Sequence, residues 1–136
     1  MAETKYGKYF IEKPIVEGRF APKLQFHSTD YFGEKNFSVH YNCIAEPFLM
    51  VQEAHSHDFD EFLHFIGGNS MDITDFDAVV ELSLGEEGEK HVITEPTIVH
   101  VPKGMLHCPL EFKVVNKPII FMNVALTPEY IKPSKK

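Results

Sequence analysis

Residues 53–68 read EAHSHDFDEFLHFIGG, and this stretch decides both the fold and the candidate chemistry of the chain. Side chains at positions i and i+2 of a strand face the same way, so His55 and His57 can present two imidazoles side by side. A turn at 58–60 would let Glu61 open the next strand beside them. Two imidazole nitrogens and a carboxylate oxygen suit a divalent transition metal ion. The alternative is a hydrated surface hairpin with scattered histidines.

A second signal lies downstream, where residues 102–107 read PKGMLH. Pro102 and Gly104 favour a turn, and His107 follows where a new strand should begin. This histidine could bring a third imidazole inward. Three histidines and a glutamate would hold a divalent ion and leave open positions for water, oxygen or a chelating substrate.

Together the two segments resemble the two sequence motifs of the cupin superfamily. The first segment has two histidines separated by one residue, a Glu four positions on and a closing Gly, and the second has the pattern Pro-x-Gly-x-x-His. The resemblance implies an all-β fold, a double-stranded β-helix or jelly-roll barrel. It also implies metal ligation by His55, His57, Glu61 and His107, with Fe, Mn, Ni, Zn or Cu as candidate ions.

The rest of the sequence is typical of an all-β protein, because Pro and Gly separate short segments rich in Val, Ile, Phe and Tyr. No segment has a convincing helical period. Strict alternation is clearest over 78–84, which ends at Gly85. Nine strands are expected, over residues 23–27, 36–44, 48–57, 61–66, 78–84, 91–94, 97–101, 107–112 and 119–126. The pattern alone does not distinguish a sandwich from a barrel.

A length of 136 residues favours one domain, here 1–136, with a core barrel over 48–126 that carries both motifs. Residues 1–35 are expected to form an N-terminal arm and outer strands. The apolar segment 8–20, broken by Pro14, is expected to pack on the body or on a second subunit, which predicts a homodimer. The polar, basic tail 131–136 is expected to be loose.

The composition and net charge of the chain limit the classes of partner that it is expected to bind. The chain is 43% hydrophobic and 24% charged, and its formal charge is −7 at pH 7, which disfavours nucleic acid as a partner. The sequence shows no apolar leader and no run long enough to span a membrane. A cytoplasmic location is therefore expected, and Cys43 and Cys108 are expected to be reduced thiols.

Several further residues are candidates for the surroundings of the ion. If the strand over 48–57 is regular, Glu53 faces inward with Val51 and Leu49, where it could act as a general base or orient an imidazole. Cys108 should point away from the ion, because it directly follows His107. The side chains of His40 and Tyr41 should point to opposite faces of a strand, so at most one of them can line the cavity. Phe59, Leu63 and Phe65 are expected to form an apolar interior. His64, His91 and His100 are expected to lie outside the site.

Three functions are compatible with these features. The first is a metal-dependent enzyme, of dioxygenase, isomerase or lyase type, acting on a small oxygenated organic substrate chelated to the ion. The second is a non-catalytic module that binds a metal or a small ligand. The third keeps the barrel without a metal and uses the histidines directly in acid–base chemistry. Fold resemblance alone does not choose among them.

Overall fold

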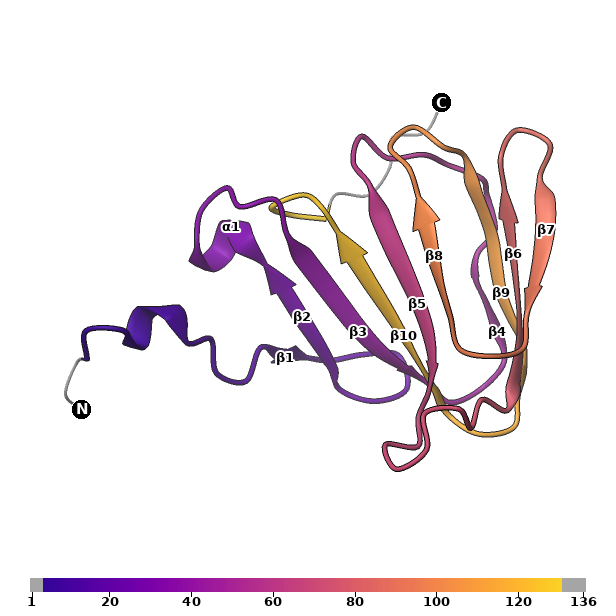
Figure 1. Cartoon of the computed structure of the whole chain (residues 1–136), viewed down its shortest axis with the longest axis horizontal. Coiled ribbons are helices and arrows are strands. Elements are labelled where there is room, and N and C mark those ends of the chain that lie inside the picture. The colour runs from indigo at the N-terminus through magenta and orange to yellow at the C-terminus, as the bar shows by residue number, and fades with distance from the viewer. Residues whose placement is uncertain (1–3, 131–136) are drawn as a thin grey trace.

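The computed structural model describes residues 4–130, which form two antiparallel sheets packed face to face (Figure 1). The tail 131–136, expected to be loose, lies outside the described residues. No helix among residues 4–130 combines the length and the apolar character needed to cross a membrane.

The larger sheet has the order β1-β2-β3-β10-β5-β8 and the smaller has the order β4-β9-β6-β7. The larger sheet is made of β1 (Ile15–Val16), β2 (Lys23–His27), β3 (Ser38–Ile44), β10 (Ile119–Ala125), β5 (Glu61–Gly67) and β8 (Thr97–Val101). The smaller is made of β4 (Phe48–Val51), β9 (His107–Val115), β6 (Ala78–Leu84) and β7 (Glu89–Ile93). From β3 to β10 the chain passes back and forth between the two sheets, with only the hairpin β6–β7 staying in one sheet, as in a jelly roll, which confirms the predicted double-stranded β-helix.

Within residues 4–130, helical structure is limited to a 3-10 turn, η1 (Gly7–Tyr9), and a single α-helical turn, α1 (Ser28–Tyr31). The expected strands 23–27, 78–84 and 97–101 have the predicted bounds. The strand expected over 48–57 is much shorter, because β4 ends at Val51. The sheet also includes β3, which lies upstream of the segment 48–126 that we expected to form the core barrel.

The core lies between the sheets and is built by period-two alternation. On β5, Glu61, Leu63, Phe65 and Gly67 are buried while the residues between them are half-buried. The rings of Phe65 and Phe121 in the larger sheet pack against Phe112 in the smaller one, with centroids 6.3 and 5.9 Å from it. This aromatic layer joins the two sheets.

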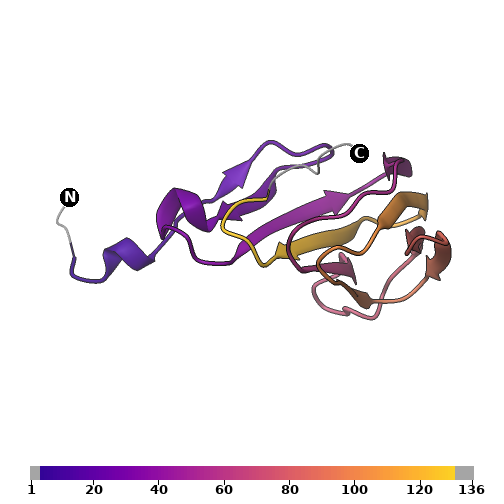
Figure 2. The same ribbon diagram turned by 90° about the horizontal axis from the view of Figure 1, so that it is seen from above.

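The N-terminal arm leaves the body at the edge of the larger sheet (Figure 2). The two residues of β1 pair with β2, and Gln25 donates its backbone N–H to the carbonyl of Pro14 at 2.9 Å. An edge position tolerates this proline, since the outer side of the strand needs no donor. Tyr9 and Phe10, further out on the arm, are 62% and 71% exposed.

The aromatic layer gives a direct stability test. Replacing Phe112, which is completely buried, by alanine should lower the free energy of unfolding by about 3–5 kcal/mol, because it leaves a cavity between the sheets. Replacing the exposed Phe10 in the same way should change it by less than about 0.5 kcal/mol. Urea unfolding monitored by circular dichroism measures both values, and equal effects of the two substitutions would contradict the assigned core.

Candidate metal centre

Two loops from distant parts of the chain are joined by backbone hydrogen bonds at the candidate site. His55 and His107 form an isolated antiparallel bridge, in which each N–H donates to the other residue's carbonyl, at 3.1 and 2.9 Å. Gly104 donates its N–H to the carbonyl of His57 at 2.9 Å. The turn at Pro102 and Gly104 is therefore fixed against the loop that carries the first two histidines, and the imidazole centroids of His55 and His107 lie 4.3 Å apart.

Glu61 is the buried acid of the cluster. It opens β5, as predicted, and is only 1% exposed. Its Oε1 lies 3.4 Å from Nε2 of His57 and 3.3 Å from Nε2 of His107, while its Oε2 accepts a hydrogen bond from the Asn123 side-chain amide at 2.9 Å. The ligand atoms of His57, Glu61 and His107 lie within 4.8 Å of one another.

His55 belongs to a second, overlapping group. Its ring nitrogen, a ring nitrogen of His107 and the Cys108 sulfur also lie within 4.8 Å of one another. The structure thus brings His57, Glu61 and His107 into one cluster and places His55 beside it through the shared His107.

Hydrogen bonds at Nδ1 set the protonation of two imidazoles. Nδ1 of His55 lies 3.2 Å from the carbonyl oxygen of Glu53, and Nδ1 of His107 lies 3.2 Å from that of Met105. A carbonyl only accepts, so each Nδ1 carries the proton and each neutral ring has its lone pair on Nε2. Metal-binding histidines are commonly oriented in this way.

The resulting arrangement is electrostatically incomplete. The lone pair of His107 Nε2 faces Glu61 Oε1, which is buried and accepts no hydrogen bond from any residue in the described part of the chain. A buried carboxylate oxygen without a partner is unfavourable, and a lone pair facing it adds repulsion. A cation between these atoms would remove both costs, so the residues fit a metal ion.

Burial governs the protonation of the cluster. Burial lowers the pKa of His57 from 6.5 to about 4 against the opposing effect of Glu61, and it also lowers the pKa of His55. For Glu61, burial alone would raise the pKa, but the adjacent His107, the adjacent His57 and the Asn123 amide, which donates a hydrogen bond to Oε2, together lower it. His55 and His57 are therefore neutral and Glu61 is ionised at neutral pH, which are the forms that bind metals.

A polar wall beside the cluster is formed by His40, which the sequence analysis named as a possible cavity residue, and by His27 and Tyr130, which it did not name. His27 and His40, on neighbouring strands β2 and β3, approach with their Nε2 atoms 2.8 Å apart. The Tyr130 hydroxyl lies 3.2 Å from Nε2 of His57, and its ring lies 5.6 Å from that of His40. Burial lowers the pKa of His40 to about 4 and raises the pKa of Tyr130. His40 lines this wall whereas Tyr41 is exposed, as their opposite directions predict.

The apolar surroundings agree with expectation. Leu63 and Phe65 are buried, and the half-buried ring of Phe59 stacks on His57 with centroids 4.8 Å apart. Three histidines lie outside the cluster. The His64 side chain points to the opposite face of β5 from Glu61 and hydrogen-bonds to the carbonyls of Phe62 and Met122. His91 contacts Glu89 at the surface, and His100 contacts Asp60 there.

Three side-chain orientations predicted from strand parity are wrong. Leu49 and Glu53 are exposed instead of facing inward, because the register with β9 shifts between Leu49 and Val51 and β4 ends at Val51, so regular alternation does not continue to His57. Glu53 reaches the site only through its backbone carbonyl, which orients His55. Cys108 was expected to point away from the ion, but its sulfur lies beside His55 and His107.

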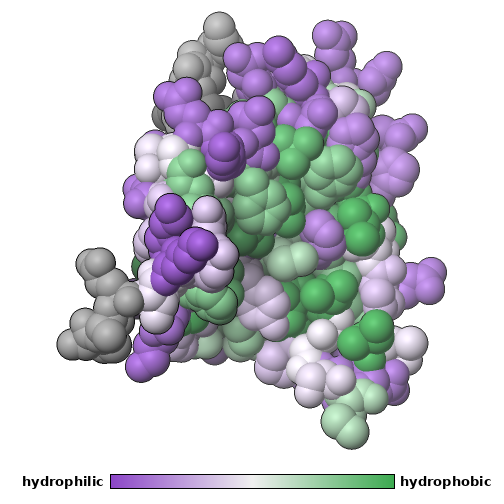
Figure 3. Space-filling model, turned by 60° about the vertical axis from the view of Figure 1, so that its left-hand side comes forward, coloured by the Kyte–Doolittle hydropathy of each residue, from purple (hydrophilic) through white to green (hydrophobic). Residues whose placement is uncertain are grey.

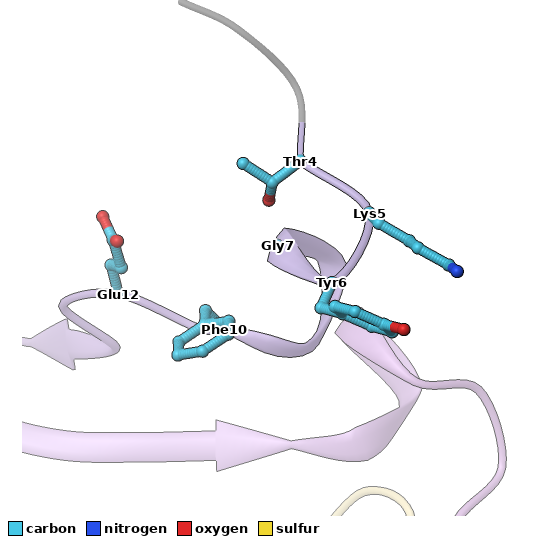
Figure 4. A pocket seen from close by; sticks show the side chains of 6 residues that line it. All are labelled: Thr4, Lys5, Tyr6, Gly7, Phe10 and Glu12. Atoms are coloured by element: carbon cyan, nitrogen blue, oxygen red, sulfur yellow. The ribbon is translucent and has the colours of Figure 1, made fainter.

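Two other hollows contain none of the four predicted ligands. One is on the arm (Figure 4) and is lined by Thr4, Lys5, Tyr6, Gly7, Phe10 and Glu12. The other lies between β7 and β8 and is mainly apolar.

Comparisons with known proteins agree with the fold. No protein-family model and no curated protein matches the sequence. Among solved structures, a two-residue deletion mutant of Bacillus subtilis oxalate decarboxylase superposes with a TM-score of 0.58 at 12% identity, covering 87% of this chain and 28% of that one. Another oxalate decarboxylase structure, described by its substrate binding mode, gives 0.56 at 15% identity, covering 86% and 28%.

A third structure, of the same Bacillus subtilis enzyme, is described by its Mn(II) centres and gives a TM-score of 0.55 at 13% identity, covering 81% of this chain and 26% of that one. The chain thus spans little more than a quarter of the length of these structures. Oxalate decarboxylase is a cupin enzyme, and the similarity shows that this chain has the cupin fold.

The buried histidines predict a pH dependence of stability. In the unfolded chain His40 takes up a proton near pH 6.5, but in the folded protein only near pH 4. The unfolded state therefore binds more protons between these values, and the free energy of unfolding of the metal-free protein should fall as pH is lowered through this window. Denaturant unfolding at several pH values measures this slope.

The His40→Asn variant should show a shallower slope than the wild type, because one of the contributing imidazoles is gone. Asn42→Ser, on the same strand, removes no titratable group and should keep the wild-type slope. An unchanged slope in His40→Asn would show that the pKa of His40 is the same in the folded and unfolded states, and would contradict this prediction.

Proposed function

We propose that this chain is a metal-dependent cupin enzyme, with His55, His57, Glu61 and His107 as the ligands of one divalent transition ion. The substrate would be a small oxygenated organic molecule that chelates the ion, and the reaction would be of dioxygenase, isomerase or lyase type. When bound, the ion would supply Lewis-acid polarisation of substrate oxygens, or oxygen activation if it is iron.

One observation carries the proposal. Oε1 of Glu61 is buried and unpaired within the described chain, and it faces Nε2 atoms of two histidines at 3.3 and 3.4 Å. A structural ion pair with His57 would need a protonated imidazole, but burial lowers the pKa of His57 to about 4. A metal ion completes the cluster without protonating either ring.

The polar wall would supply the protein's own acid and base. His40 is neutral at neutral pH and can accept a proton, while the Tyr130 hydroxyl stays protonated and can donate one. Both side chains are half-buried. Tyr130 lies next to His57, and the His40 ring lies next to the Tyr130 ring. We therefore assign proton transfer to His40 and Tyr130 in place of Glu53, whose carboxylate is exposed.

The first substrates to test are small carboxylates. Oxalate decarboxylase, which shares the fold, acts on a dicarboxylate that suits chelation, and diketones and hydroxy acids offer the same pair of oxygens. The net charge of −7 gives no general attraction for such anions, so the ion would have to provide it.

Metal binding is the first test. Protein purified without added metal, then stripped and titrated with Mn²⁺, Fe²⁺ or Zn²⁺, should bind one ion per chain in calorimetry and elemental analysis. Alanine at His57 or His107 should abolish stoichiometric binding of Mn²⁺, while His64→Ala and His100→Ala, which remove imidazoles outside the cluster, should leave it unchanged. Affinity should fall as the pH is lowered toward about 4, because imidazole must be neutral to coordinate and burial lowers the pKa of His57 to about that value.

Stoichiometric binding that survives the combined His55→Ala, His57→Ala change would place the site elsewhere. Turnover then separates an enzyme from a binding module. The metal-loaded protein should consume at least one chelating substrate, and Tyr130→Phe should lower kcat while keeping one bound ion. Tight ligand binding without consumption of any such compound would instead favour a non-catalytic module.

We also propose that the chain forms a homodimer through its arm. Tyr6, Tyr9 and Phe10 are each at least 60% exposed, and the arm extends away from both sheets (Figures 1 and 2). Further apolar side chains gather on one face of the body (Figure 3). Exposed aromatic side chains in such number commonly mark a protein interface.

Light scattering tests the dimer. The wild type should have the mass of two chains, and the combined change Tyr6→Ser, Tyr9→Ser, Phe10→Ser should halve it by removing apolar contact area. Ile98→Ser, which alters an exposed apolar residue on β8, should leave the mass unchanged. A wild-type mass of one chain would refute the proposal.

A further inference from the structure

The side chain of Cys108 is part of the centre, although β-strand parity places it on the other side. Its sulfur and one ring nitrogen from each of His55 and His107 lie within 4.8 Å of one another. The thiol is 5% exposed and lies in no disulfide. The ligand set proposed above does not use it.

An irregularity in β9 explains the orientation. Leu82 pairs with Leu110 and Leu84 pairs with His107, so two steps along β6 correspond to three along β9. Cys108 sits in this bulge with a φ of 89°, a value that non-glycine residues rarely adopt. The extra residue rotates the chain so that consecutive side chains, those of His107 and Cys108, both reach the cluster. Such a backbone outlier is retained only where the surroundings impose it, and it often marks a functional site.

The two donor groups share one residue and differ in chemistry. His57, Glu61 and His107 offer nitrogen and oxygen, whereas His55, His107 and Cys108 offer nitrogen and sulfur. Carboxylate-containing sets suit ions such as Mn²⁺, and thiolates select thiophilic ions. Glu61 is only 1% exposed, and its Oε1 has no hydrogen-bond partner in the described chain. This unpaired oxygen independently indicates a cation at this place.

We propose that Cys108 is an alternative metal ligand, which lets the centre hold a thiophilic ion through His55, His107 and Cys108. The proposal rests on the metal centre proposed above and adds a second way of occupying it. On binding, a metal–sulfur bond forms and the thiol proton leaves to solvent. The donors must move slightly inward, because Zn–N and Zn–S bonds of about 2.0–2.3 Å bring ligand atoms closer than their present spacing.

Cadmium ion is a suitable probe, because it is thiophilic, redox-inert and gives a thiolate-to-metal charge-transfer band in the ultraviolet. Metal-stripped full-length protein under reducing conditions is titrated with Cd²⁺ and, separately, with Mn²⁺. The wild type should develop the band with an end point at one equivalent of Cd²⁺. Cys43→Ser, which removes the only other cysteine of the sequence, should behave identically.

Cys108→Ser should lose the band and bind Cd²⁺ at least about 10-fold more weakly, since even loss of an outer-shell partner commonly costs that much. Its affinity for Mn²⁺ should stay within about twofold of the wild-type value, because the carboxylate-containing group is intact. This retained Mn²⁺ binding also shows that the variant is folded.

The outcomes distinguish the two proposals. Stoichiometric Cd²⁺ binding without the band, in the wild type and in Cys43→Ser, would overturn the role of Cys108 and leave the metal centre in place. A band that disappears in Cys43→Ser would assign the thiolate to the other cysteine and overturn the inference as well. Failure of wild-type protein to bind either ion would refute the metal centre itself, and with it this inference.

Discussion

The candidate centre depends on one short piece of backbone pairing, the two hydrogen bonds between His55 and His107. Neither residue lies in a long ladder with the other, since β4 ends before His55 and β9 begins at His107. The bridge nevertheless holds two loops together, and the Gly104–His57 hydrogen bond adds a second tie. Because these bonds fix main-chain positions, the imidazoles converge before any ion is present.

Burial then determines which charges the converging side chains can carry and which of their polar atoms lack partners. Glu61 is only 1% exposed, and its Oε1 finds no hydrogen-bond donor in the described chain. Neutral imidazoles and an unpaired carboxylate oxygen are a costly combination in a folded protein without a cation. An ion that binds only the folded state would offset this cost and stabilise the protein. The metal site and the stability of the barrel are thus energetically linked.

Sequence reasoning identified the parts of the molecule that follow from local periodicity. Alternation over 78–84 and 97–101 gives the correct strands, and the two motifs place His57, Glu61 and His107 in one cluster. It failed where the backbone departs from a regular strand. The early end of β4 exposes Glu53, and the bulge at Cys108 turns its thiol inward. The pairing of His27 with His40 and the approach of Tyr130 depend on tertiary contacts between residues far apart in the chain, for which the sequence holds no periodic signal.

The central claim is that a divalent ion sits between Glu61 and the imidazoles of the two loops. Anomalous diffraction at the manganese edge, from crystals of the stripped protein soaked in Mn²⁺, locates such an ion directly. The account predicts one strong peak per chain, at about 2.0–2.3 Å from Oε1 of Glu61 and from Nε2 of His57 and His107. A fully formed barrel with no peak among these three side chains, or with its strongest peak on surface carboxylates, would contradict it.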